Sequence, residues 1–150
     1  MKILIDADAC PKIVKELLLK TSEKRGVKLL FVANHFIRLP KSEHISSIQV
    51  AQGFDVADEE IVRQIETGDL VITADIPLAS SAIEQGAKAL NPRGTFYSEQ
   101  NIAERLAMRD LMEGLRDNGL VSGGPKAYGG KEKERFANEL NKFLCRALKG

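Results

Sequence analysis

KILIDA at residues 2–7 and LVITA at residues 70–74 are the two apolar runs that decide the fold. Short apolar runs bounded by turn residues are typical of buried strands. Each run is followed by a proline, Pro11 or Pro77, which suits the first turn of a helix because its missing N–H would be unpaired there. Both stretches therefore predict a buried strand that leads into a helix.

The rest of the first two thirds continues this alternation. Further strands are predicted at residues 28–33, 45–50 and 88–90, and helices at residues 11–26, 55–67 and 77–86. The order β-α-β-β-α-β-α-β predicts an α/β fold, with a mostly parallel sheet of about five strands and helices on both faces. The direction of the strand at 45–50 stays open at this point.

The last third has a different, helical pattern. Residues 98–150 are predicted as a helical extension of an α/β core at residues 1–97. Its two helices are expected at 101–118, where Asn101 and Glu104 have the spacing of a capping box, and at 131–148. A glycine-rich loop at 122–130 would join them. We interpret residues 1–150 as a single domain, because a chain of this length rarely divides into two cores.

Composition excludes several classes of protein. The 150 residues include 43% hydrophobic and 29% charged residues with a net charge of +1, which excludes a broadly basic coat for DNA. Two Cys and two His are too few for a regular zinc finger or a disulfide scaffold. Two acids interrupt the first apolar run, unlike a signal peptide, and no apolar run approaches the ~20 residues of a membrane helix. We expect a cytoplasmic protein without a membrane partner.

Aspartates gather where the first and fourth predicted strands end. Asp6 and Asp8 follow the first strand, Asp75 follows the fourth, and Asp55 and Asp58 begin the helix that leads into the fourth. Ligands of open α/β sheets bind beyond the carboxyl ends of strands, at the switch in strand order. If the two strands are neighbours, these carboxyls converge, and at least one should have a raised pKa. Mg²⁺ or Mn²⁺ is the natural counter-ion for such a cluster.

Plainer roles and a rival chemistry compete for some of these residues. Asp55 suits a helix N-cap, and Asp69 opens its strand at the opposite end of the sheet, which favours a structural role. The opening ILIDADA (3–9) is similar to that of haloacid-dehalogenase-type phosphatases, in which Asp6 would be the nucleophile. Gly68-Asp69, followed by Asp75, is faintly similar to a later acidic motif of those enzymes. In them, however, the Gly-Asp pair follows a strand, whereas here it precedes one.

Cysteine and histidine residues are minor candidates for chemistry at the site. Cys10 has Glu16 where a cysteine phosphatase needs arginine, so we interpret it as a packed thiol. His35 and His44 lie in one predicted loop and are a minor candidate for a metal pair.

Several motifs together resemble the bacterial YaiI/YqxD family, which is grouped with PIN-like domains. They are IDADACP (5–11), VAN (32–34), GFDVADEEIV (53–62), GDLVITADIPLA (68–79), NPRG (91–94), LAMRDLM (106–112) and SGGP (122–125). The resemblance implies a PIN-like three-layer sandwich and a nuclease site that cuts RNA or DNA with Mg²⁺ or Mn²⁺. It also implies that the acids of that site fall on Asp6, on Asp58 or less favourably Asp55, and on Thr73-x-Asp75.

One departure from the PIN-like pattern concerns the residues after Asp75. Many PIN-like nucleases have a further acid there, whereas residues 76–78 are Ile, Pro and Leu. Asp8 is expected to supply the missing carboxylate and to bind metal with the other three acids.

Phosphate contacts are expected from Thr73, Arg93 and Asn34, and Arg105 is a further cationic candidate on the predicted helix at 101–118. Arg109 of the same helix is expected to be partly buried against apolar neighbours. The leading hypothesis is a Mg²⁺- or Mn²⁺-dependent nuclease that hydrolyses phosphodiester bonds in RNA by a metal-bound water, with Asp6, Asp58 and Asp75 as catalytic residues. The alternatives are a non-catalytic module that binds nucleic acid or protein and, third, a haloacid-dehalogenase-type phosphatase.

Overall fold

A five-stranded parallel sheet forms the centre of the computed structural model, which describes residues 1–53, 55–117, 119 and 127–148. The strands are β1 (Lys2–Asp6), β2 (Lys28–Ala33), β3 (Ile45–Gln49), β4 (Leu70–Ile72) and β5 (Lys88–Leu90), in the order β3-β2-β1-β4-β5. Every neighbouring pair is parallel, so the direction of β3 is now settled. β1 and β4 are neighbours, as expected, and the strand order switches between them.

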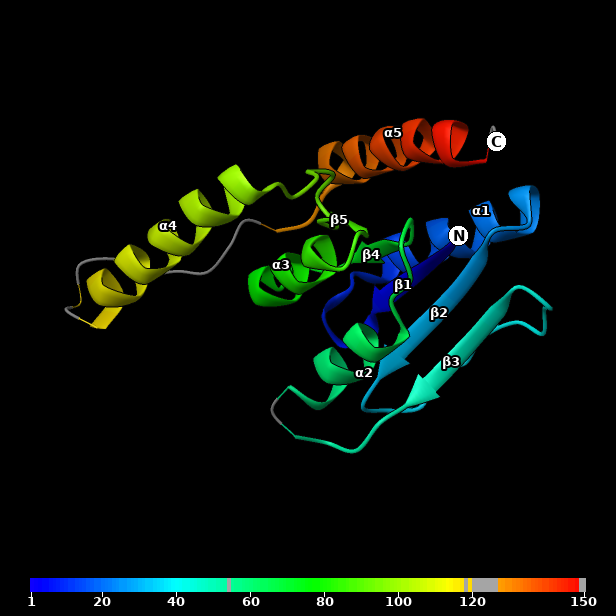
Figure 1. Cartoon of the computed structure of the whole chain (residues 1–150), viewed down its shortest axis with the longest axis horizontal. Helices are drawn as coiled ribbons and strands as arrows, with labels where there is room; N and C mark the ends of the chain where they lie inside the picture. Colours follow the sequence, from blue (N-terminus) through cyan, green and yellow to red (C-terminus); the bar gives the residue numbers. More distant parts are fainter. Residues whose placement is uncertain (54, 118, 120–126, 149–150) are drawn as a thin grey trace.

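Helices cover both faces of this sheet (Figure 1). They are η1 (Ala7–Ala9), a short 3₁₀ turn, and α1 (Lys12–Arg25), α2 (Val56–Gln64), α3 (Ile76–Glu84), α4 (Glu99–Asp117) and α5 (Gly130–Ala147). Successive side chains of a strand point to opposite faces. Ile3 and Ile5 therefore pack in one apolar layer with α1 and α5, whereas Leu4 packs in the other with α2, α3 and the start of α4. The predicted three-layer α/β architecture is confirmed.

A close backbone approach holds α5 on the sheet. Gly94 follows β5 with φ 95°, and a Cβ added there would lie 2.7 Å from the backbone N of Phe136 in α5. Only glycine satisfies both the positive φ and this contact. Phe136 itself is completely buried, so the NPRG turn and α5 together close one apolar layer.

Two predicted helix boundaries were wrong. α4 begins at Glu99 rather than at residue 101, because Ser98 is its N-cap: the Asn101 N–H donates to Ser98 Oγ at 3.2 Å, and Asn101 Oδ1 accepts from the Ser98 N–H at 2.8 Å. The capping box therefore exists, with Ser98 in the place predicted for Asn101. α2 ends at Gln64 rather than at residue 67, because Ile65 adopts an extended conformation.

The far half of α4 extends away from the sheet (Figure 1). Met108 and Leu111 are exposed there, and the Arg109 side chain is 50% exposed and pairs with Glu113 at 3.5 Å. The expected partial burial of Arg109 was wrong, because its side chain lies on an exposed face of α4. Residues 120–126, which include most of the predicted glycine-rich loop, lie outside the described residues. No helix in the described part of the chain is long and apolar enough to cross a membrane.

Candidate active site

Asp6 lies at the end of β1, beside the switch in strand order. Its side chain is buried, and its Oδ2 accepts a hydrogen bond from Thr73 Oγ1 at 3.1 Å. Burial raises the pKa of Asp6, and the charges of Asp75 and Asp8 raise it further, while the Thr73 bond opposes them. Asp6 is thus a buried carboxyl whose nearest charges have its own sign.

Thr73 joins Asp6 to Asp75 in the connection between β4 and α3. Its Oγ1 donates to Asp6 and accepts from the Asp75 N–H at 2.9 Å. Asp75 is the N-cap of α3, and its Oδ1 accepts from the Leu78 N–H at 2.9 Å. Thr73 therefore fixes the relative position of the two aspartates, and its predicted contact with phosphate stays a prediction.

Asp58 reaches the same place from the first turn of α2. Its pKa is raised to about 6, mainly by burial, and then by the charges of Asp75, Asp6 and Asp55 and by a hydrogen bond with Asp75. Within the described part of the chain, Asp6, Asp58 and Asp75 form no ion pair with Lys, Arg or His. We call these three residues the carboxyl triad. The expected rise of at least one pKa is confirmed.

Asp55 and Asp8 lie near the carboxyl triad but have other surroundings. Asp55 occupies the N-cap position of α2 with φ 64° and forms no side-chain cap hydrogen bond, so the predicted capping role was wrong. An N-cap side chain reaches the helix N–H groups from extended backbone, which Asp55 lacks. Asp8 lies in η1, where Oδ2 accepts from the Asn34 N–H at 2.9 Å and Oδ1 lies 2.8 Å from His35 Nδ1.

These contacts limit how many of the acids are positioned to bind one metal ion. Among the described residues, no group of three or more His, Cys, Asp or Glu side chains is already arranged to hold a metal ion. Asp8 influences Asp6 through its charge but is engaged with the loop after β2. The structure therefore brings together three of the predicted acids. The fourth, Asp8, instead accepts a hydrogen bond from the backbone of Asn34 in the loop after β2.

Arg93, the predicted phosphate contact after β5, faces α5. Its guanidinium lies 3.6 Å from Glu132 and 6.0 Å from the centre of the Tyr128 ring. Its backbone N–H donates to Asn91 Oδ1 at 2.8 Å. The structure thus places Arg93 against the N-terminus of α5, where part of its charge is already balanced.

Arg105, one of the α4 arginines that the sequence offers for phosphate, is linked to the carboxyl triad through Tyr97. The Arg105 guanidinium of α4 lies 5.1 Å from the centre of the Tyr97 ring. Tyr97 Oη donates to the Thr73 carbonyl at 3.2 Å and accepts from Asn91 Nδ2 at 2.8 Å. Burial raises the pKa of Tyr97, Arg105 lowers it and Asp75 raises it, so both charges act on this ring.

The sequence contains only weak signals that Asn91, Tyr97 and Arg105 lie near the carboxyl triad. Asn91 directly follows β5, so its place at the carboxyl edge of the sheet follows from the parallel order. Tyr97 and Arg105 reach the site only because the chain after β5 turns back and starts α4 beside α3. No spacing in the sequence encodes that turn.

The structure separates the groups on which rival chemistries depend. Cys10 is packed in the apolar core, and burial raises its pKa to about 12, as expected for a structural thiol. His35 follows the end of β2, whereas the His44 carbonyl accepts from Leu29 near its start, so the two cannot form a metal pair. Asp69 lies at the opposite end of β4 from the triad, which leaves the phosphatase motif without its second acid at the site.

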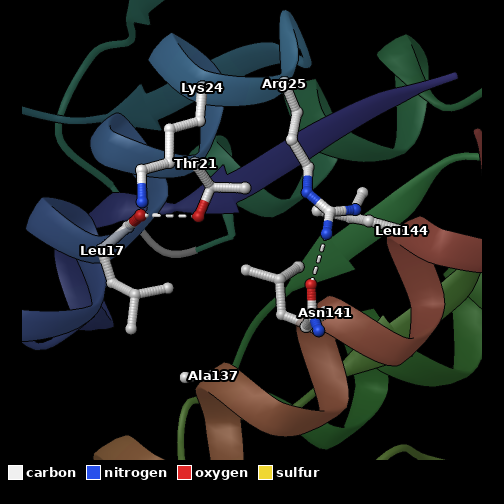
Figure 2. A pocket seen from close by; sticks show the side chains of 8 residues that line it. Leu17, Thr21, Lys24, Arg25, Ala137, Asn141 and Leu144 are labelled. Atoms are coloured by element: carbon white, nitrogen blue, oxygen red, sulfur yellow. Dashed lines mark hydrogen bonds between the residues drawn. The ribbon is translucent and has the colours of Figure 1, made fainter.

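Two clefts of similar size lie in different parts of the molecule. One, of about 300 Å³, lies between α1 and α5, where Arg25 donates to Asn141 Oδ1 at 2.5 Å (Figure 2). It is formed by the packing of the two helices on the face that carries Ile3 and Ile5. The other, of about 310 Å³, lies between α2 and α3, and Asp58 is part of its lining. Only the second cleft adjoins the carboxyl triad.

Comparisons with known proteins find close relatives of the whole chain. The sequence model described as "Uncharacterized BCR, YaiI/YqxD family" matches residues 4–146. A "UPF0178 protein" of Maridesulfovibrio salexigens is 57% identical over 99% of this chain and 98% of its own length. Another "UPF0178 protein", from Syntrophotalea carbinolica, is 53% identical over 97% of this chain and 99% of its own. No solved structure gives a significant match. None of these names states an activity.

Proposed function

This chain belongs to the YaiI/YqxD family, and we propose that it hydrolyses phosphodiester bonds, with RNA as the favoured substrate and Mg²⁺ or Mn²⁺ as cofactor. One observation carries the proposal: three carboxyls meet at the switch in strand order without a cationic partner among the described residues. Like charges brought together in this way destabilise a fold unless a ligand compensates them. The position is also the one where open α/β sheets bind ligands.

The donor set fits a hard divalent cation. Mg²⁺ is usually held by one or two carboxylates, with waters and substrate phosphates completing its octahedron, so a ready-made group of three ligands is not required. Thr73 holds Asp6 and Asp75 together, and these would be the two carboxylates, with Asp58 next to them. Asp8 and Asp55 are less suited, because Asp8 is engaged with Asn34 and His35, and Asp55 is exposed.

The carboxyl triad then has two tasks, which are to hold the cation and to accept a proton. The bound cation would lower the pKa of water and neutralise phosphate charge. Asp58 would accept the proton of the attacking water, because it lies beside the pair that would hold the cation and forms no ion pair among the described residues. The water oxygen forms the new bond to phosphorus, the opposite P–O ester bond breaks, and the departing alkoxide takes a proton from solvent. The hydrogen bonds of Thr73 keep Asp6 and Asp75 in the same relative position throughout the reaction.

Arg105 is the cation best placed to contact the phosphate. It is partly buried over Tyr97 and forms no ion pair within the described residues. A guanidinium presents a planar fork that matches phosphate oxygens. Arg93 and Asn34 stay predictions for this role. Arg105→Ala is expected to weaken RNA binding about tenfold, whereas Arg109→Ala, on the exposed face of the same helix, should leave it unchanged.

Cleavage of labelled single-stranded RNA in the presence of Mn²⁺ tests the proposal. We expect Asp58→Asn and Asp75→Asn to lower the rate at least 100-fold, since a positioned acid or base typically contributes roughly 10²–10⁴-fold. Asp110→Asn, an exposed carboxyl of α4, is the matched control and should retain the full rate. Cleavage that survives Asp75→Asn unchanged would show that the site is wrong. A parallel arm with single-stranded DNA decides between the two nucleic acids.

A non-catalytic module that binds nucleic acid or protein is the second candidate. The observation that favours it is the apolar sequence after Asp75, where Ile76, Pro77 and Leu78 add no acid. Calorimetric titration with Mn²⁺ separates the candidates: a catalytic site should bind below ~1 mM, and a pocket without turnover that has lost its metal should give no heat.

A further inference from the structure

The cleft between α2 and α3 combines apolar walls with acidic side chains. Its volume is about 310 Å³, at the lower end of the roughly 300–1,000 Å³ of small-molecule pockets. Val62 and Pro77 contribute apolar surface from the two helices. Asp55, Asp58 and Glu59 contribute carboxylates, all from the N-terminal end of α2. This lining suits a flat, mostly apolar ligand that presents N–H donors.

We propose that this cleft binds a nucleobase with an exocyclic amino group, from the nucleotide next to the phosphate that is cut. The proposal rests on the proposed function, which specifies RNA but not the base beside the phosphate. Carboxylate oxygens accept hydrogen bonds from base amino groups, as in the pairing of Asp or Glu with the N4 amino group of cytosine. Asp55 and Glu59, which lie outside the carboxyl triad, repel phosphate, so the base enters this cleft and the backbone stays outside.

The cleft and the carboxyl triad are continuous. Asp58 belongs to both, and Asp75 is the N-cap of the helix whose Pro77 and Leu78 line the cleft. A nucleotide with its phosphate at the triad therefore has its base within reach of α2 and α3. Apolar side chains supply stacking surface to any base. The carboxylates favour cytosine over uracil, because the O4 of uracil would face their negative charge.

A linear polyamine is the other ligand that acidic side chains attract. It would use the carboxylates and leave the surface of Val62 and Pro77 without a partner. The apolar walls therefore favour a base, and spermidine serves as the competing probe in the test.

Nucleosides test this site without phosphate, metal or turnover. Cytidine, uridine and spermidine are each titrated into the labelled protein and followed by NMR. We expect cytidine to shift the amide signals of Val62, Leu78 and Ser81, and to bind about tenfold more tightly than uridine. Glu59→Gln should reduce that preference severalfold, because it removes one acceptor charge from the cleft. Glu60→Gln, which lies next in sequence and pairs with Arg63 outside the cleft, should preserve it.

Several outcomes would overturn the inference. These are equal binding of cytidine and uridine, cytidine shifts confined to residues outside the cleft, or displacement of cytidine by spermidine with no nucleoside preference left. The two proposals fail separately. RNA that is never cut, while cytidine still occupies the cleft, contradicts the nuclease and retains the base site. RNA that is cut, with no nucleoside in the cleft, retains the nuclease and contradicts the base site.

Discussion

Asp69 and Asp75 lie just before and just after β4, and their surroundings differ in the sign of the nearby charge. Asp69 is buried and accepts from the Lys2 ammonium at 2.7 Å, from the Lys2 N–H at 3.0 Å and from the Glu66 N–H at 2.9 Å. Asp75 faces the carboxyls of Asp58 and Asp6 instead. The fold therefore compensates a carboxylate at one end of the strand and assembles uncompensated carboxyls at the other.

The difference separates a structural acid from a functional one. A buried carboxylate is tolerated when a cation and hydrogen-bond donors surround it, as at Asp69. A group of carboxyls without such partners costs stability, and that cost is recovered when a cationic ligand binds the folded state. The two ends of β4 should consequently respond in opposite ways to removal of a negative charge.

The largest effect is expected at Asp69. Asp69→Asn leaves the Lys2 ammonium beside a neutral amide and should lower the free energy of unfolding by roughly 3 kcal/mol, in the range for a broken buried pair. Urea denaturation at pH 7 measures it. A loss below about 1 kcal/mol would mean that this pair behaves as a surface ion pair, and the contrast with Asp75 would disappear.

Asp58, unlike Asp69, has no cationic partner among the described residues, and it should make the free energy of unfolding depend on pH. Its folded pKa of about 6 lies above the ordinary value of 3.8, so the folded chain binds more protons between about pH 4 and 6 and loses stability as pH rises through that range. After allowance for solvent screening of this partly exposed group, the loss should be about 1–2 kcal/mol. Denaturation midpoints measured across this pH range test it. Asp58→Asn should flatten the profile, and an unchanged slope would assign it to other groups.

Removing one charge from the triad should stabilise the metal-free protein. Asp75→Asn keeps the cap on the Leu78 N–H, because Asn and Asp are similar N-caps, and relieves repulsion with Asp58 and Asp6. We expect a gain of about 1 kcal/mol at pH 7, or roughly 2–4 °C in Tm for a chain of this size. Asp75→Ala is the comparison, since it loses the cap as well and should melt below Asp75→Asn. A lower Tm for Asp75→Asn than for the wild type would make Asp75 a structural cap alone.

The smallest effect is expected at Asp8, which lies at the same edge of the sheet as the triad. Asp8→Asn preserves an oxygen for the Asn34 N–H and loses only a partly exposed pair with His35. Such pairs contribute about 0–1 kcal/mol, so the denaturation midpoint should hardly change. Calorimetry with Mn²⁺ completes the test, because unchanged affinity in Asp8→Asn excludes Asp8 as the fourth metal ligand, whereas a large loss of affinity would restore it.

The α/β core was predictable from the sequence because short apolar runs and prolines mark strands and helix starts. The same reasoning placed Asp6 and Asp75 at one edge of the sheet, since parallel strands bring their carboxyl ends together. Asp58, which lies on α2, was chosen over Asp55 through the family resemblance. Sequence reasoning misplaced the details that depend on tertiary contacts. The left-handed backbone of Asp55, the bond from the Asn34 N–H to Asp8 and the position of Arg105 over Tyr97 all depend on contacts between segments distant in sequence or on local backbone geometry. Hydrophobic periodicity carries no signal for them.

A thermal shift with Mn²⁺ tests the central claim, that the carboxyl triad holds a divalent cation, without knowledge of the substrate. Wild-type protein, Asp75→Asn and Asp110→Asn are melted at pH 7 with and without Mn²⁺. A cation at 100 times its Kd stabilises the native state by about 2.7 kcal/mol, which corresponds to several degrees in Tm. We predict that shift for the wild type and for Asp110→Asn, and its loss in Asp75→Asn. An equal shift in all three proteins, or none in the wild type, would contradict the account.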